Sequence, residues 1–292
     1  MEAIKKNVGI IFLCILAVVA SLVWHTVFYL EAHRNLLVTF FDVGQGDAIF
    51  IEVPNGNQIL IDGGPNERIL TKLGRVLPFW DRSIDMLILT HPHADHLDGL
   101  VEVLKRYDVG MVVESGAEHS IPEYQEWRKL LKESGADVVM ARAGQRINVG
   151  RGIVLDVLSP FDDFDVKTAK DPHDAMVVTR LRHGENSILL MGDAEKSIEY
   201  RLLFESGLKF YSLKSKILKV GHHGSKTSTS EEFLRAVSPE VALIQVGKKN
   251  RYGHPRQEVL DRLATAGIRL LRNDIDGDIR LESDGLSYII RR

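Results

Sequence analysis

One short segment, Thr90–His96, concentrates side chains that bind metal ions. It reads THPHADH and holds three of the 11 histidines of the 292-residue chain, together with an aspartate. His91 and His93 are two residues apart at the end of an apolar run. In extended backbone both imidazoles therefore point to one side and can reach one ion. Imidazole and carboxylate donors suit zinc, manganese or iron.

Asp95 and His96 can serve a second ion. Because they are adjacent, extended backbone would turn them to opposite sides. Where the chain passes from a strand into a helix, they can instead face one point close to the first. Two ions about 3.5–4 Å apart are served by such an arrangement. We therefore expect a binuclear metal centre at this segment.

Two later strands end in residues that can complete this centre. Asp193 follows the apolar run SILLMG, where its carboxylate can bridge two ions or cap the helix that comes next. His222 and His223 follow KILKVG, and the sequence leaves open which of them is a ligand. His173 lies in a polar loop, where it either adds to the centre or, as we expect, is a surface residue.

Three other segments place polar residues next to apolar runs. Asp62, in LIDGG, is expected to orient a ligand imidazole rather than to bind an ion. NRYGHP places Asn250 and His254 near a helix start, a natural anion site, although His254 equally fits an exposed cap. The glycine-rich segment FFDVGQGDA either lines the centre or forms a tight turn; its polar residues are Asp42, Gln45 and Asp47.

Short strands alternate with helices in both halves of the chain. The pair Asn55-Gly56 between apolar runs predicts a β-hairpin. Such a pattern fits an α/β (α+β) fold, a four-layer αβ/βα sandwich of two sheets with helices outside, and leaves a single mixed sheet open. The spacing of apolar residues predicts helices over residues 67–79, 96–107, 121–134, 194–205, 230–237 and 254–266.

The first residues predict a membrane anchor. Val8–Leu30 is 23 residues long without a formal charge, and as a helix it would span about 34 Å, enough for a bilayer core. Lys5 and Lys6 precede it, which places the N-terminus in the cytoplasm and the remainder outside. A cleaved signal peptide and a buried soluble helix are the alternatives. We expect residues 1–34 to be a cytoplasmic stub and transmembrane helix, and residues 35–292 to be one domain.

Composition argues against a disulfide-stapled protein and against a strongly basic protein that binds nucleic acid through its overall charge. Cys14 is the only cysteine, so no disulfide links the chain to itself. The net charge is −3, and it is −4 for residues 35–292 because residues 1–34 carry three basic and two acidic side chains. No global basic field therefore attracts nucleic acid. A local basic stripe near the paired histidines is expected from Lys214, Lys216, Lys219 and Lys226.

Taken in order, these motifs resemble a known family. THPHADH, with DGG before it and MGD after it, is similar to the metallo-β-lactamase-fold hydrolases. More narrowly, FFDVGQGDA, LIDGG, THPHADHLDGL, LLMGDAE, LKVGHHGSKTSTS and NRYGHP resemble the hydrolase domain of ComEC-type competence proteins. The similarity runs from about Leu37 to the C-terminus. The family's large channel portion is missing from the match, so we expect a stand-alone, membrane-anchored relative.

The resemblance also implies roles for residues. Two divalent ions, zinc or manganese, are expected on His91, His93, Asp95, His96, Asp193 and His223. The superfamily's third histidine position falls on DPHDAMVV, where Asp174 is a candidate ligand in its place. Asp95, His222 and His254 are expected to be catalytic. The residues expected to bind substrate are Asn250, Ser225 and Lys226.

Three functions follow as expectations. The first is a metal-dependent phosphodiesterase or nuclease that acts on DNA at the bacterial cell membrane, with its C-terminal domain outside the cytoplasm. The second is hydrolysis of cell-envelope phosphoesters such as choline-phosphate. In the third, the chain is a metal-binding adaptor without activity that partners a separate DNA-uptake channel.

Overall fold

The computed structural model describes residues 12–26, 35–161, 171–209 and 212–292. The chain divides into two compact units, Met1–Asn35 and Leu36–Arg292. In the first unit, residues 12–26 are helical, and the rest of the predicted membrane segment lies outside the described residues. Among the helices that the structure describes, none combines the length and apolar character needed to cross a bilayer.

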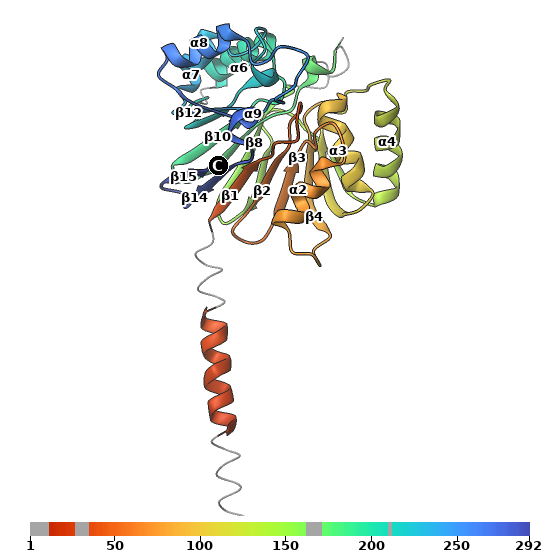
Figure 1. Ribbon diagram of the computed structural model, residues 1–292, viewed down its shortest axis with the longest axis vertical. Coiled ribbons are helices and arrows are strands. Elements are labelled where there is room, and N and C mark those ends of the chain that lie inside the picture. The colour runs from red at the N-terminus through yellow and green to blue at the C-terminus, as the bar shows by residue number, and fades with distance from the viewer. Residues whose placement is uncertain (1–11, 27–34, 162–170, 210–211) are drawn as a thin grey trace, which may run out of the picture. The chain divides into compact units, whose positions relative to one another are not determined.

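Within the described residues, the second unit is built on two sheets (Figure 1). The first has the order β15 (Tyr288–Arg291), β14 (Ile279–Ser283), β1 (Leu36–Phe40), β2 (Ile49–Glu52), β3 (Gln58–Ile61), β4 (Ser83–Leu89), β5 (Asp108–Glu114) and β6 (Asp137–Met140). The second has the order β13 (Arg269–Arg272), β12 (Val241–Ile244), β11 (Ile217–Lys219), β10 (Asn186–Leu190), β9 (Val178–His183), β8 (Ile153–Ser159) and β7 (Arg146–Gly150).

The two sheets face each other, and helices cover their outer faces. Buried side chains from both sheets form one central apolar cluster, which includes Phe40, Ile88, Leu155 and Leu243. Two further clusters lie beneath the helices. The first sheet carries α2 (Arg68–Val76), α3 (Ala94–Leu104) and α4 (Pro122–Ser134), and the second carries α6 (Lys196–Lys209), α7 (Glu231–Val237) and α8 (Gln257–Thr265). The remaining helical turns are η1 (Pro172–Ala175), η2 (Gly221–Gly224) and α9 (Asn273–Asp276).

This arrangement confirms the four-layer sandwich and excludes the single mixed sheet. The predicted hairpin is present, because β2 and β3 pair with Glu52 opposite Gln58 across the Asn55-Gly56 turn. Local signals explain several helix ends: α4 begins with Pro122, and Gly135 follows it in the left-handed conformation. Several helix boundaries differ from the predicted ones by a few residues, and the one that affects the motif is the start of α3, at Ala94 rather than His96. The THPHADH segment therefore enters its helix two residues earlier than expected.

Parallel strands give the sandwich two distinct edges. β3, β4, β5 and β6 run parallel in the first sheet, as do β10 to β13 in the second. We call the edge at which these strands end the carboxyl edge, and the opposite edge, at which they begin, the amino edge. Loops at the carboxyl edges of parallel strands are the usual place for a site.

Candidate metal centre

Segments from both sheets meet at the carboxyl edge. THPHADH follows β4 in the first sheet, Asp193 follows β10 in the second, and η2 follows β11 beside it. A hydrogen bond from the Val177 amide to the Thr90 carbonyl, 2.9 Å long, joins the two sheets at this place. The residues predicted at strand ends are thereby brought together.

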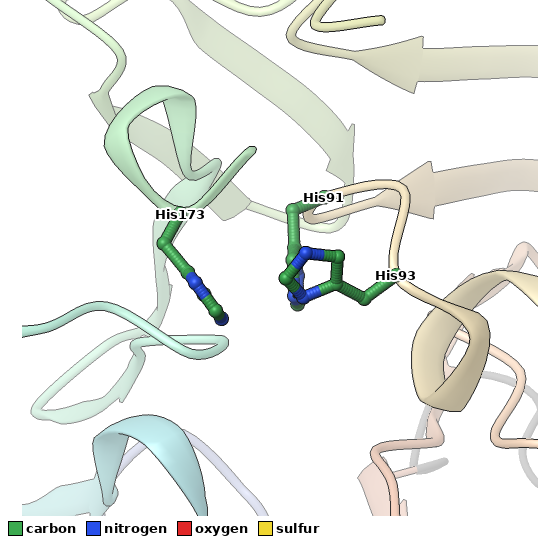
Figure 2. A group of neighbouring side chains, drawn as sticks. All are labelled: His91, His93 and His173. Atoms are coloured by element: carbon green, nitrogen blue, oxygen red, sulfur yellow. The ribbon is translucent and has the colours of Figure 1, made fainter. Parts of the chain in front are cut away.

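Three histidines form the first donor group. His91 Nε2 lies 3.0 Å from His93 Nδ1, and the rings of His91 and His173 have centroids 4.9 Å apart. One nitrogen of each histidine lies within 4.8 Å of the others. In Figure 2, His173 reaches the other two from a separate segment, and all three rings face a common space. Three imidazoles facing one space suit a transition-metal ion.

His173 is the ligand candidate that the sequence analysis placed on the surface. His173 lies in η1. The Asp171 carboxylate accepts a hydrogen bond from the backbone amide of His173 and lies 2.7 Å from the Nδ1 atom of the His173 ring. Asp174, the residue proposed for this position, is exposed and belongs to none of the donor groups among the described residues. The 3₁₀ turn that begins at Pro172 directs His173 inward and Asp174 outward.

The second donor group combines two carboxylates with two imidazoles. His96 Nε2 lies 3.4 Å from Asp193 Oδ2 and 4.0 Å from Asp95 Oδ1. His223 Nε2 lies 3.3 Å from Asp193 Oδ2 and 3.4 Å from Asp95 Oδ2. His96, Asp193 and His223 are buried, whereas the Asp95 side chain is partly exposed. All four were predicted ligands, and the structure places them around one point.

Asp193 also belongs to a third group, with His173 and His222. His222 Nε2 lies 3.9 Å from Asp193 Oδ2, while its Nδ1 lies 3.1 Å from Glu195 Oε1. Both histidines of the HHGS motif therefore face the centre, His223 from one side and His222 from the other. The Asp193 carboxylate therefore belongs to both the second and the third donor group.

Asp62 orients the His96 ring through hydrogen bonds on the side of the ring away from Asp193. Its carboxylate accepts hydrogen bonds from the amide and hydroxyl of Thr90, at 2.9 and 2.7 Å, and lies 2.7 Å from His96 Nδ1. The helix that carries His96 lies close because Gly99 meets Gly63 backbone to backbone, where a Cβ on either would collide with the other. Asp62 thereby fixes the ring orientation of His96, in the manner expected of a carboxylate behind a ligand.

A buried lysine, Lys219, supports the same region. Its side chain is fully buried, forms an ion pair with Asp47, and donates a 2.7 Å hydrogen bond to the Gly192 carbonyl. Asp47 Oδ1 lies 3.4 Å from His223 Nδ1, which is also 2.8 Å from the Gln245 carbonyl oxygen. The sequence analysis expected Lys219 to be part of a basic surface stripe. That prediction is wrong, because the opposing sheet covers the side chain.

The electrostatics of the two donor groups differ. Burial and the neighbouring histidines lower the pKa of His91 well below its usual value and that of His93 to about 4. Burial also disfavours the charged forms of His96 and His223, but nearby carboxylates, Asp193 first among them, raise the pKa of both well above the usual value. His91 and His93 are therefore neutral at pH 7, whereas the second group has acidic partners that attract cations.

The donor atoms fit metal ions. Several buried donor atoms of the predicted and observed ligand candidates have no hydrogen-bond partner among the described residues, among them His96 Nε2, His173 Nε2, His223 Nε2 and Asp193 Oδ1. Buried polar atoms are ordinarily satisfied, so unpaired atoms that face one another require a ligand. Imidazole nitrogens and carboxylate oxygens are the donors that zinc, manganese and iron accept.

The glycine-rich segment has mixed roles. Asp47 lies at the centre, whereas Asp42 Oδ1 accepts the Gly44 amide at 3.1 Å as in a tight turn. Gln45 Oε1 accepts the Gly247 amide at 3.2 Å and links the two sheets. Gly46 is required because a Cβ there would collide with the Asp95 carbonyl. The segment thus both lines the centre and forms a turn.

The predicted substrate-binding residues lie beside the centre with contacts of their own. Asn250 donates to the Gly247 and His254 carbonyls and accepts from the His254 amide, so its amide group shapes the loop. The ring centroid of His254 lies 5.7 Å from that of His222. The Ser225 hydroxyl is buried against Thr227, 2.9 Å away. Lys226 is exposed.

The chain is similar to proteins of known family. A family model described as the metallo-beta-lactamase superfamily matches residues 41–248. ComE operon protein 3 of Bacillus subtilis is 32% identical over 263 residues, covering 83% of this chain and 32% of that protein. Recombination protein 2 of Haemophilus influenzae is 33% identical over 250 residues, covering 84% of this chain and 28% of that protein. The chain spans about a third of the length of these curated relatives.

A solved structure shares the fold. The metallo-beta-lactamase fold protein YhfI from Bacillus subtilis superposes with a TM-score of 0.58 at 12% identity. The superposition covers 86% of this chain and all of that one. At this identity the likeness concerns the fold alone.

Proposed function

This chain belongs to the metallo-β-lactamase superfamily, and on that premise we propose that it is a metal-dependent phosphodiesterase whose substrate is DNA. The observation that carries the proposal is the position of the Asp193 carboxylate between two donor groups. Paired metal sites of this kind suit displacement at phosphorus, where the attacking and leaving oxygens both need stabilisation. The name of one relative, recombination protein 2, favours DNA over other phosphodiesters.

We assign two divalent ions, zinc or manganese, to the centre. One would be held by His91, His93 and His173, and the other by Asp95, His96, Asp193 and His223. Asp193 and His173 also form a group with His222, which joins the two sets. When bound, such ions polarise a phosphoryl oxygen and lower the pKa of water. Asp62 holds His96 in place, and the pair of Lys219 and Asp47 does the same for His223.

His222 and His254 are the remaining imidazoles that face the centre. The Glu195 carboxylate beside His222 Nδ1 fixes its ring, so that Nε2 points to Asp193. Burial lowers the pKa of His222, so Nε2 would face the centre as a proton acceptor and could serve as a general base. Burial, together with the nearby histidines, lowers the pKa of His254 to about 4. His254 is therefore neutral at pH 7, and its role is that of a hydrogen-bond donor to substrate.

The membrane anchor is part of the proposal. The uncharged segment Val8–Leu30 is long enough to cross a bilayer, and Lys5 and Lys6 before it favour a cytoplasmic N-terminus. The domain from Leu36 onward would then lie outside the cytoplasm, where it meets incoming or extracellular DNA. A separate membrane channel is the partner that such a role calls for.

A second candidate is hydrolysis of a small cell-envelope phosphoester such as a choline-phosphate. The charge of the domain favours this candidate. Residues 35–292 have a formal net charge of −4, and the burial of Lys219 removes one member of the expected basic stripe. DNA-binding surfaces are ordinarily basic.

One substrate panel tests these proposals. The purified full chain, loaded with Mn²⁺ or Zn²⁺, is given single-stranded DNA, duplex DNA, bis(p-nitrophenyl) phosphate and a phosphocholine ester, with His91→Ala as the control. Metal-dependent DNA cleavage that His91→Ala lacks supports the first proposal, and turnover of the phosphocholine ester alone supports the second. Bound metal without turnover of any substrate rejects both and supports the adaptor. Equal cleavage by His91→Ala would reveal a contaminating nuclease and reject the assignment.

A further inference from the structure

Three large apolar side chains project from the amino edge, at the end of the sandwich opposite the metal centre. Phe79 is 84% exposed and Trp80 is 72% exposed, in the loop between α2 and β4. Their rings meet edge to face with centroids 4.8 Å apart, so they form one projection. Leu286, in the turn between β14 and β15, is 77% exposed. Exposed apolar clusters of this kind mark surfaces that contact a partner.

These side chains lie on both sides of the point at which the chain enters the sheet. β1 pairs with β14 in antiparallel register, with Leu36 opposite Ser283, so the turn that carries Leu286 is beside Leu36. β1, β2, β3 and β4 are consecutive neighbours, and β1 runs in the direction of β4. The loop with Trp80 therefore begins at the same edge, about three strand spacings, or about 15 Å, from Leu36.

Chain length ties this edge to the predicted membrane segment. The uncharged run ends at Leu30, six residues before Leu36. Even fully extended, six residues reach only about 20 Å. If Val8–Leu30 crosses the bilayer, the amino edge is held within that distance of the lipid headgroups.

We propose that the amino edge is a second membrane contact, in which Phe79, Trp80 and Leu286 enter the interfacial layer of a lipid bilayer. The inference rests on the membrane anchoring in the proposed function and goes beyond it, since a single anchor leaves the domain free to tumble. Tryptophan favours the interfacial layer because the layer accommodates both the indole ring and its N–H, and Phe79 and Leu286 would add apolar surface beside it. Two exposed arginines close to the aromatic pair in sequence, Arg75 and Arg82, are suited to lipid phosphates.

The contact would set the orientation of the domain. The metal centre lies at the carboxyl edge, separated from Trp80 by the seven residues of β4, or about 23 Å. With the amino edge on the membrane, the centre faces away from the lipid. A polymeric substrate could then approach it without crossing the bilayer surface.

The three tryptophans of the chain provide the test. Trp24 lies in the helix over residues 12–26, Trp80 in the amino-edge loop, and Trp127 is fully buried on the inner face of α4. The full chain is reconstituted into phosphatidylcholine/phosphatidylglycerol vesicles whose acyl chains are either plain or brominated, because bromine quenches indoles that enter the lipid. Trp24→Phe reports Trp80, Trp80→Phe reports Trp24, and the double variant reports buried Trp127 alone.

We expect brominated lipid to remove roughly a third or more of the emission of Trp24→Phe, since Trp80 would sit at the interface, and none of the emission of the double variant. Quenching of Trp80→Phe without quenching of Trp24→Phe would overturn the inference while leaving the anchor intact. If neither single variant is quenched, the anchor and the second contact are rejected together. Equal metal content in all three variants verifies that the domain is folded.

Discussion

His173 places its ring 4.4 Å from that of His93, although the two residues reach this point from opposite sheets. His93 follows β4 of the first sheet, and His173 precedes β9 of the second. The first donor group therefore exists only while the sheets are packed together. A bound ion would link the two halves of the sandwich and stabilise the fold by mass action.

Replacement of His173 tests this relationship. His173→Ala removes one of three imidazoles from the first donor group, so we expect metal affinity at that group to fall by more than about tenfold. Metal content, measured by mass spectrometry after equilibrium dialysis, should drop by about one ion per chain. The matched control is the adjacent, exposed residue: Asp174→Ala should retain full metal content. If Asp174→Ala loses metal and His173→Ala does not, the ligand assignment is reversed.

Asp62 should act through His96. Asp62→Ala removes the acceptor of the His96 Nδ1 proton and of the Thr90 amide, so the ring loses its fixed orientation. We expect a loss of about 10- to 100-fold in metal affinity or in activity. Titration with a chromophoric chelator measures the affinity. An Asp62→Ala variant with wild-type affinity would show that packing alone orients His96.

The buried pair of Lys219 and Asp47 gives a prediction about stability. Lys219→Met leaves the Asp47 carboxylate buried without its cation, which should lower the free energy of unfolding by about 3–5 kcal/mol. Lys219→Met combined with Asp47→Asn removes both charges and should recover most of that loss. Urea unfolding of the two variants and of the wild type measures the coupling. Equal losses in the single and double variants would contradict an interaction between the two charges.

The contact between Gly99 and Gly63 predicts a steric effect. A methyl group at Gly99 would collide with the Gly63 carbonyl, so Gly99→Ala should push α3 away and lower the free energy of unfolding by about 1–3 kcal/mol. Gly74, within α2, has open space where a methyl group would lie, and Gly74→Ala should stabilise the fold by about 0.5–1 kcal/mol. Thermal unfolding measures the two variants: the melting temperature should fall for Gly99→Ala and rise for Gly74→Ala. A shift of the same sign in both variants would refute the steric argument.

Asp156 predicts a pH dependence of stability. Burial disfavours its charged form, but hydrogen bonds from Arg182 and Arg146 and the charge of Arg180 outweigh burial and lower the pKa of Asp156 below its usual 3.8. The folded state therefore binds this proton more weakly than the unfolded state. The stabilisation is complete above pH 3.8 and is lost as the pH falls through the folded pKa.

The corresponding variant is Asp156→Asn. At pH 7 it should be less stable than the wild type by about 1–2 kcal/mol, a range that allows for solvent screening of the partly exposed arginines. Urea unfolding at pH 7 and pH 3 should show the difference shrinking at the lower pH. Asp137→Asn, at an exposed position of β6, serves as the control without an effect. If the difference in unfolding free energy between the wild type and Asp156→Asn grew at low pH, the pKa of Asp156 would be raised in the folded state rather than lowered.

Local patterns were sufficient to predict most of the fold and to place His96, Asp193 and the paired histidines at one edge, whereas the choice of His223 over His222 came from the family resemblance. His96, Asp193 and His223 each follow a strand or begin a helix next to one, and parallel strands bring such positions to a common edge. The Asn55-Gly56 hairpin and the helices depend on turn chemistry and apolar spacing, which are also local. Each of these features is encoded within about ten neighbouring residues.

Two residues depended on tertiary contacts that no local pattern encodes. His173 lies in a polar segment without periodicity, and the hydrogen bond between Val177 and Thr90 is a tertiary contact that holds that segment against His91. Lys219 is a charged residue at the end of an apolar run, and a lysine is ordinarily found at the surface. Its burial results from Asp47 on the opposing sheet, more than 170 positions earlier in the chain.

The backbone at the paired histidines restricts which replacements are informative. His222 and His223 both adopt left-handed φ angles, 46° and 49°, which β-branched residues rarely tolerate but asparagine accepts. A valine or isoleucine there would distort the corner itself, so lost activity could not be attributed to the missing imidazole. Asparagine preserves the turn and isolates the chemistry of the ring. Sequence variation at this corner is thus limited by chain geometry as well as by catalysis.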